Sequence, residues 1–306
     1  MISRFYLFFA MFALSCGNYD PTPEIDTPVR GKIKISIDEN LQPVSDELID
    51  AFESSYPDAF LLQSYGPEQK MIEELYNDSS RLAMMTRTLN AEELKYFAGK
   101  QFSVEHIRLG SDAVVFLVNR ENTDSIFTID QVRKIIAGHD SVWSQVNPDS
   151  KLGSLRVVFD NSSSSNVRYL NDTLLRGERT GKNCFALNSS DTVVDYVSTH
   201  PNAIGIVGLN WLSDRDKSED RMRLSLIRLA LIGKDRPTAV RPHQSALVTK
   251  DYPFTRNFWL VKIGKRAGLG TGFATFCLSE RGQLIVQRAG LAPAAPAQRK
   301  IHLNVL

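Results

Sequence analysis

The sequence predicts an α/β protein, and three observations support this class. The chain has 306 residues, which is enough for two domains of about 100–150 residues each. Its composition, 42% hydrophobic and 23% charged, is that of an ordinary globular protein. From Gly31 onward, patterns typical of strands and of helices alternate. Such alternation indicates a sheet covered by helices on both faces, which binds ligands at the carboxyl ends of its strands.

The first third of the chain is predicted to contain three strand–helix units. Residues 32–37 alternate apolar and polar side chains, as a half-buried strand does, and residues 44–54 repeat apolar side chains at helical spacing. The later strands and helices of this part are expected at residues 60–65, 68–76, 81–86 and 91–97. Thr88 or Asn90 is available to cap the last helix.

The rest of the chain continues the alternation. Residues 113–118 form an apolar strand, and Thr128 caps a helix that runs through Ile136 and stops at Gly138. The charge-dense segment 214–223 is expected to be a solvent-facing loop. The further strands are expected at residues 155–159, 203–209, 223–232 and 252–263, and the further helices at residues 193–199 and 270–288.

The run Phe159–Asn166, with four consecutive serines, is the most informative stretch for function. It ends one predicted strand and begins a helix near Ser163. Free backbone N–H groups and hydroxyls at the start of a helix attract anions, because unpaired donors and the positive end of the helix dipole converge there. Serine is also a common helix cap. The run alone leaves both interpretations open, an anion cradle or a cap.

Charge and motifs argue against several classes of function. A formal net charge of +1 gives no reason to expect nucleic acid as a partner. The sequence has no C-x-x-C and no H-E-x-x-H motif, and no metal site is predicted. His139, His200 and His243 have no pattern that brings them together with a nucleophile. We therefore expect no enzyme and no cofactor.

The N-terminal residues predict export and lipidation. Phe5–Leu14 is a purely apolar run, too short to span a bilayer but suited to a signal peptide. Leu14–Gly17 (LSCG) then resembles a bacterial lipobox, although alanine stands three residues before the cysteine, where leucine is usual. We expect residues 1–16 to be a lipoprotein signal ending at Cys16, which becomes lipidated, and residues 17–30 to be a polar tether. A plain secretory signal is the alternative.

A lipoprotein of this kind would lie in the cell envelope, anchored by lipid to the inner or the outer membrane and facing the periplasm. Two cysteines, Cys184 and Cys277, remain after processing, and each has apolar neighbours. They either form a disulfide or stay as buried free thiols, because their spacing carries no information on geometry.

Several segments together resemble the phosphate-specific ABC-transporter substrate-binding proteins. Leu109–Asn119 (LGSDAVVFLVN) is similar to the family's crossing strand, and residues 128–143 are similar to its next helix and glycine–tryptophan turn. The other matching segments are Ala203–Leu209 for its AIGY strand, Tyr252–Arg256 for its YPLTR segment and residues 268–293 for its final helix. Their order and spacing carry the resemblance.

The resemblance implies a two-lobed type II periplasmic binding protein fold, in which crossing hinge strands join two α/β lobes that close over a ligand. The first lobe would comprise residues 31–110 plus 240–306, and the second residues 111–239. The family performs no chemistry. It holds phosphate, a dehydrated oxyanion, with backbone N–H groups, hydroxyls and an arginine, and it works with an ABC permease.

The framework of the family matches better than its ligand loops. Asp38 and Glu39 stand where the family has hydroxyls, Glu68 adds a negative charge at a helix start, and Phe159 replaces an arginine. The ligand contacts that the resemblance implies are Asn40, Thr86, Arg87, Ser163, Ser164, Ser165 and, aligned with the family's aspartate, Arg81.

Two carboxylates near an oxyanion would each repel it by about a few kcal/mol at an effective dielectric near 20. One interpretation is that Arg81, Arg87 or Arg168 neutralises them. A second is that the acidic loops bind a cationic or zwitterionic ligand, or a partner surface. A third is that Asp38 and Glu39 cap the following helix and face solvent. For Arg81, an ion pair with Asp78 explains the residue as well as a ligand contact does.

Two functions follow, from different classes. The first is an extracytoplasmic solute-binding lipoprotein that holds phosphate or a similar oxyanion for ABC-type import. The second is an adapter or scaffold lipoprotein that keeps the binding fold with an altered pocket and recognises an envelope protein. The serine run and Arg87 favour the first, and the acidic substitutions favour the second.

Overall fold

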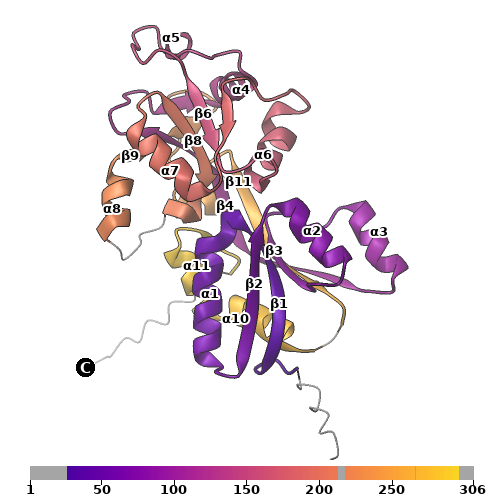
Figure 1. Ribbon diagram of the computed structural model, residues 1–306. Helices are drawn as coiled ribbons and strands as arrows, with labels where there is room; N and C mark the ends of the chain where they lie inside the picture. The colour runs from indigo at the N-terminus through magenta and orange to yellow at the C-terminus, as the bar shows by residue number, and fades with distance from the viewer. Residues whose placement is uncertain (1–25, 213–217, 266, 296–306) are drawn as a thin grey trace, which may run out of the picture.

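The computed structural model of the chain describes residues 26–212, 218–265 and 267–295. Two α/β lobes lie one above the other and share strands that pass between them (Figure 1). The predicted two-lobed α/β fold class is confirmed.

The lower lobe of Figure 1 is built on a mixed sheet with the strand order β2-β1-β3-β11-β4. The strands β1 (Gly31–Asp38), β2 (Ala59–Gly66) and β3 (Leu82–Met85) run parallel, and β11 (Thr255–Ile263) is antiparallel to β3 and to β4. Because the first three strands are parallel, their carboxyl ends meet at one edge of the sheet. That edge faces the other lobe (Figure 1).

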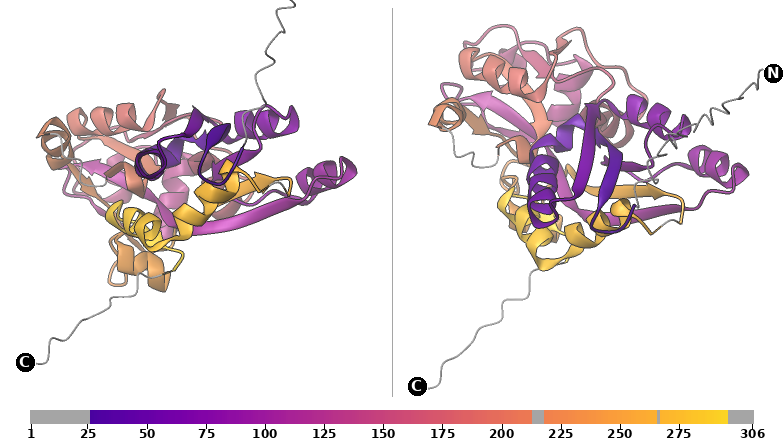
Figure 2. Two further views of the ribbon diagram at one scale, coloured as in Figure 1. Left: turned by 90° about the horizontal axis from the view of Figure 1, so that it is seen from below. Right: turned by 60° about the horizontal axis from the view of Figure 1, so that its bottom comes forward.

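Helices cover both faces of this lower sheet, as Figure 2 shows from two further sides. Phe52 and Phe273 meet edge to face on one side of it. The other side buries Met71, Leu75 and Phe97 against β3. The helices concerned are α1 (Gln42–Ser55), α10 (Leu269–Leu278) and α11 (Glu280–Arg288) on the first side, and α2 (Glu68–Tyr76) and α3 (Ala91–Gly99) on the second.

The upper lobe continues the same sheet through β4 (Val104–Asn119), which pairs with β11 over its first part and with β8 over its second. This long strand is therefore the structural link between the lobes. Beyond it the strands follow the order β8 (Ala203–Gly208), β6 (Arg156–Phe159) and β7 (Cys184–Ala186), and β9 (Ile227–Leu229) also pairs with β4.

Helices flank the upper sheet as well. Thr128 and Gln131 form a capping box at the start of α4 (Ile129–Ala137), and Gly138 ends the helix in the left-handed region, at φ 79°. The other upper helices are α5 (Trp143–Val146), α6 (Ser165–Leu170) with a π-helical turn at Asn171–Leu175, α7 (Ser190–Thr199) and α8 (Ser218–Ser225). The remaining elements are α9 (Gln244–Thr249), β5 (Ile126–Thr128), β10 (Leu231–Gly233), β12 (Ala292–Pro293) and the 3-10 turns Glu39–Leu41 and Leu209–Leu212.

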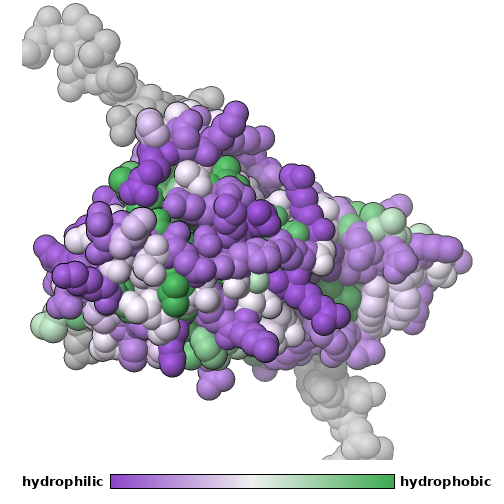
Figure 3. All heavy atoms as spheres, turned by 90° about the horizontal axis from the view of Figure 1, so that it is seen from above, coloured by the Kyte–Doolittle hydropathy of each residue, from purple (hydrophilic) through white to green (hydrophobic). Residues whose placement is uncertain are grey.

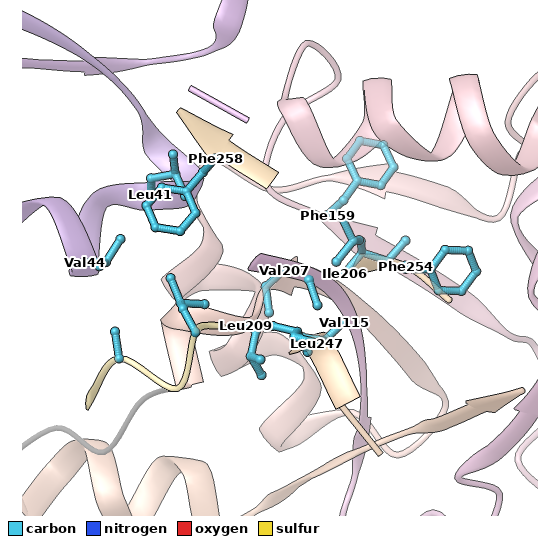
Figure 4. Packing of buried hydrophobic residues seen from close by; sticks show 14 of the residues in the cluster. Leu41, Val44, Val115, Phe159, Ile206, Val207, Leu209, Leu247, Phe254 and Phe258 are labelled. Carbon is cyan, nitrogen blue, oxygen red and sulfur yellow. The ribbon is translucent and has the colours of Figure 1, made fainter. Parts of the chain in front are cut away.

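Apolar packing accounts for one departure at the ligand loops. Phe159 ends β6 and is buried in the core, where Figure 4 shows it close to Ile206 and Phe254. The residue that replaces the family's arginine is therefore part of the hydrophobic core.

The face of the molecule in Figure 3 is mainly polar, with hydrophobic residues in small groups. Within the described part of the chain, no helix has the length and apolar character of a membrane span.

Two sequence predictions of secondary structure are wrong. The single helix expected at residues 270–288 is two helices, because Ser279 leaves the helical conformation and its hydroxyl caps Gly282 N–H at 3.3 Å. The second is the predicted loop 214–223, which overlaps α8, whose Arg223 pairs with Asp191 and Asp195 of α7 at 3.0 Å each. The strand predicted at residues 223–232 begins too early, and its later part is present as β9 and β10. Residues 213–217 lie outside the described residues.

Candidate functional site

A cleft of about 580 Å³ opens where the two lobes meet. The lower lobe contributes the face of α2 together with Arg87 and Glu93. The upper lobe contributes Ser162, Ser163 and Ser164 and the first turns of α6, including Arg168. The cleft lies at the carboxyl ends of β2, β3 and β6, where a ligand site of an open α/β sheet is expected. Its volume is within the usual range for small-molecule sites.

A buried polar cluster lies behind this cleft and joins the lobes. Its centre is Asn40, which follows β1 and is fully buried. Asn40 Nδ2 donates to Asp160 Oδ2 at 3.0 Å and to Ser165 Oγ at 3.2 Å, and Asn166 Nδ2 donates to Asn40 Oδ1. Asp160, Ser165 and Asn166 all belong to the upper lobe, so one amide of the lower lobe has three partners across the boundary.

The cluster contains one guanidinium among its buried carboxylates. Arg256, on β11, donates to Asp112 Oδ2 from Nη2 at 3.1 Å and from Nε at 3.3 Å, and to Ser165 Oγ at 3.3 Å. Its side chain is 2% exposed and that of Asp112 is fully buried. Asp112 also accepts from the Leu209 N–H at 3.2 Å. Burial raises the pKa of Asp112, and the charge of Arg256 opposes this rise.

Asp38 acts both as a cap and as a cluster member. Its Oδ1 accepts from the Asn40 N–H at 3.0 Å, which caps the 3-10 turn, and its Oδ2 accepts from Thr86 Oγ1 at 3.5 Å. The residue is 1% exposed. Of the three sequence interpretations of Asp38, capping is thus correct in part, but the side chain does not face solvent.

Ion pairs among the residues that line the cleft connect the two lobes. Arg168 Nε donates to Glu68 Oε2 at 2.9 Å, Arg87 Nε donates to Glu68 Oε1, and Arg87 forms a two-bond pair with Glu93 at 2.7 and 2.8 Å. Arg168 Nη2 also donates to Thr86 Oγ1 at 3.3 Å. Glu68 and Arg87 belong to the lower lobe and Arg168 to the upper, so the network spans the boundary.

Burial dominates the electrostatics of the cluster. It raises the pKa of Asp38, of Asp112 and of Asp160, and the Arg256 guanidinium opposes this rise at Asp38 and Asp112. Burial, with the neighbouring carboxylates of Asp160 and Asp38, also raises the pKa of Glu39 to about 7. These four carboxyl groups therefore take up protons at a higher pH than ordinary carboxyl groups do, and their protonation stabilises the folded chain.

Glu39 gives a pH-dependent prediction. The folded chain holds its proton up to about pH 7, whereas the ordinary pKa is 4.5. Glu39 should therefore make the free energy of unfolding fall as pH rises from 4.5 to about 7, and Glu39→Gln should remove the part of the fall that this residue contributes. Because Glu39 is half-buried, we expect screening to limit the gain of the variant at pH 8 to about 1 kcal/mol.

The measurement is urea unfolding of both chains between pH 4.5 and 8, with Glu92→Gln on the exposed surface of α3 as the control. If the free energy of unfolding depends on pH in the same way for wild type and Glu39→Gln, the raised pKa of Glu39 is contradicted.

The structure brings together six of the seven predicted ligand contacts, but uses most of them internally. Ser164 Oγ caps α6 by accepting from the Val167 N–H, Asn40 and Ser165 lie in the buried cluster, and Thr86 and Arg87 are bonded to carboxylates. The Ser163 side chain lines the cleft and is exposed. The capping interpretation of the serine run is confirmed for Ser164, and the anion cradle stays a prediction for the serines that line the cleft.

Arg81 is the predicted contact that lies elsewhere. It precedes β3, at the amino end of that strand, whereas the cleft is at the carboxyl end. Its guanidinium pairs with Asp78 at 2.5 and 2.7 Å and stacks over Phe102. The structure therefore agrees with the ion-pair interpretation of this residue.

Sequence reasoning did not single out Asp112, Asp160 and Arg256. Arg256 lies near the start of the strand predicted at residues 252–263, just before the apolar run 258–261, and Asp112 precedes the apolar run 113–118. A lone charge beside a buried strand needs a partner of opposite charge, and this is the signal that was available.

Cys184 and Cys277 are both free thiols. Among the described residues no cluster of histidine, cysteine, aspartate and glutamate is arranged to hold a metal ion.

The fold is similar to solved structures of binding proteins over most of the chain. A protein from Clostridium perfringens, solved with bound phosphate, has 19% identity and a TM-score of 0.71, with 87% of this chain and 100% of that chain covered. An ABC-type phosphate transport receptor from Vibrio cholerae has 20% identity and a TM-score of 0.63, with 86% and 100% covered. A phosphate-binding protein from Stenotrophomonas maltophilia has 13% identity and a TM-score of 0.63, with 88% and 92% covered.

At these identities the likeness establishes the fold. No curated protein matches the sequence. A family model for the PBP superfamily domain, however, matches residues 22–281, which is most of the chain and includes both lobes and the cleft. With the crossing strands and the inter-lobe cleft in place, the resemblance read from the sequence is confirmed, and this chain belongs to the PBP superfamily.

Proposed function

We propose that this chain is an extracytoplasmic solute-binding lipoprotein that binds phosphate or a similar oxyanion in the inter-lobe cleft, for ABC-type import. The observation that carries the proposal is the placing of Arg87 and Arg168 on opposite lobes at one cleft. Guanidinium groups suit oxyanions because they donate two parallel hydrogen bonds. Ser162 and Ser163 add hydroxyl donors on the upper wall.

Relatives of similar fold support the choice of ligand. The Clostridium perfringens structure contains phosphate, and the Vibrio cholerae protein is a phosphate transport receptor. Lipid at Cys16 is part of the proposal, although this residue lies outside the described residues. Labelled palmitate should be incorporated into the full chain and not into Cys16→Ser.

The adapter remains a second candidate, because a specific observation favours it. The cleft is lined by four carboxylates, Glu68, Glu73, Glu93 and Asp172, against two guanidiniums, Arg87 and Arg168. Both arginines are already paired with carboxylates of the chain. A surface of this composition suits a partner that brings positive charge.

Calorimetric titration separates the two candidates. The full-length chain, purified in mild detergent, is titrated with phosphate, sulfate and methylphosphonate. Binding of an oxyanion should be weakened about tenfold or more in Arg168→Ala, since a hydrogen bond to a charged group is lost. Arg133→Ala, whose side chain pairs with Asp130 and Glu178 away from the cleft, is the matched control. Absence of heat with all three anions would overturn the proposal and leave the adapter.

A further inference from the structure

Glu68 has an unusual position for a residue of a cleft that takes anions. It is the first residue of α2, and its side chain is 8% exposed. One carboxylate oxygen accepts from Arg87 Nε and the other accepts from Arg168 Nε at 2.9 Å. Each oxygen thus has its own guanidinium, and the two guanidiniums come from opposite lobes.

Among the ion pairs of the described residues, Glu68 is the carboxylate that pairs with both arginines. Arg87 is held from the other side by Glu93, and Arg168 is paired with Asp172 at 3.2 Å within its own helix. Glu93 stays on the lower lobe and Asp172 on the upper lobe. The carboxylate of Glu68 is therefore the group that connects the two guanidiniums across the cleft.

A carboxylate between two guanidiniums provides what a bound oxyanion would provide, two or more negatively charged oxygens at hydrogen-bonding distance. The Glu68 carboxylate and a bound oxyanion cannot both lie between the two guanidiniums, because two negative charges repel each other strongly in a partly buried site. An oxyanion that is to reach both arginines must displace Glu68. The side chain is covalently attached, so it competes at a high effective concentration.

We propose that Glu68 is a specificity-determining residue of the cleft, a tethered anion that competes with oxyanion ligands for Arg87 and Arg168. This inference rests on the proposed function, because it assumes that the cleft takes oxyanions. Glu68 then sets a threshold, and only an anion at a sufficient concentration, or with more oxygen contacts than a carboxylate, occupies the two arginines.

The test compares phosphate binding by wild type, Glu68→Gln and Glu68→Ala in the full-length chain purified in mild detergent. Removing the competing charge should tighten phosphate binding about tenfold or more, equivalent to about 1.4 kcal/mol. Glu92→Gln, on the exposed surface of α3, changes the net charge by the same amount and should leave the dissociation constant within about twofold. The glutamine keeps the shape of the side chain and the alanine opens space, so the pair guards against failure of one variant to fold.

A thermal unfolding scan in parallel distinguishes competition from a structural role. Loss of a merely structural contact lowers stability without tightening phosphate binding. If wild type binds phosphate and neither variant binds it more tightly, the inference is overturned while the proposed function stands. If the variants alone bind phosphate, the inference is supported, and the proposed function then requires that the wild-type chain binds another oxyanion. If no chain binds any oxyanion, the proposed function and the inference fail together.

Discussion

Replacing Arg256 by methionine should destabilise the folded chain by about 3–5 kcal/mol, the usual cost of leaving a buried carboxylate without its cation. Arg256 makes two hydrogen bonds to Asp112 and one to Ser165, and all three side chains are buried. Methionine fills similar volume but carries no charge, so the loss reports mainly the unpaired Asp112. Urea unfolding at pH 8 measures it.

Two further results should accompany this loss. Asp112→Asn in the Arg256→Met background should recover part of the stability, because the amide oxygen still accepts from the Leu209 N–H without a buried charge. The loss should also be smaller at pH 5 than at pH 8, since without Arg256 the already raised pKa of Asp112 rises further and the folded chain takes up the proton.

The exposed Arg288→Met on α11 is the control and should change stability by less than about 0.5 kcal/mol. A loss at Arg256 as small as this would contradict the view that Arg256 neutralises the cluster.

Replacing Asn40 by alanine should cost about 2–4 kcal/mol, because the partners of its side chain are left buried and unsatisfied. The amide group lies between Asp160, Ser165 and Asn166 of the upper lobe. The backbone of Asn40 should keep its own contacts, the N–H with Asp38 and the C=O with Asn210 Nδ2 at 2.6 Å. The loss therefore reports the hydrogen bonds of one side chain, three across the lobes and a longer one at 3.4 Å to Asp38 Oδ1 within the lower lobe.

Urea unfolding provides the measurement, and hydrogen exchange locates the effect. Amides near the ends of β1 and β6 should exchange faster in Asn40→Ala, because the lobes lose a bond that holds these ends together. Asn77→Ala, an exposed residue after α2, is the matched control. Unchanged exchange at both strand ends would show that Asn40 does not couple the lobes.

Local patterns were sufficient where the physics is local. The strand β1 follows from the alternation of apolar and polar side chains at residues 32–37, and α4 follows from the cap at Thr128 and the glycine at 138. They failed where a partner distant in sequence decides the outcome. The charge-dense segment that was expected to be a loop forms α8, and its Arg223 pairs with α7.

The candidate site shows the same division more sharply. Sequence reasoning found the serine run from its place after an apolar strand, and it found Thr86 and Arg87 through the resemblance to the family. It left two roles open for Arg81, a ligand contact and an ion pair with Asp78, and the structure has the ion pair, at the opposite end of β3 from the cleft. It also missed Arg256, which reaches the cluster through the antiparallel pairing of β11 with β4.

The sequence by itself thus determined the fold class, the family and the place of the cleft, since these depend on apolar periodicity, turn residues and the order of segments along the chain. Only the tertiary structure decided which side chains pair with the arginines of the site. Charges on loops far apart in sequence become partners when two lobes meet, and burial then makes each pairing strong. For this reason Glu68, read from the sequence as an obstacle to an anion, is in the structure the carboxylate that pairs with Arg87 and Arg168. Arg256 pairs instead with Asp112, a residue of β4.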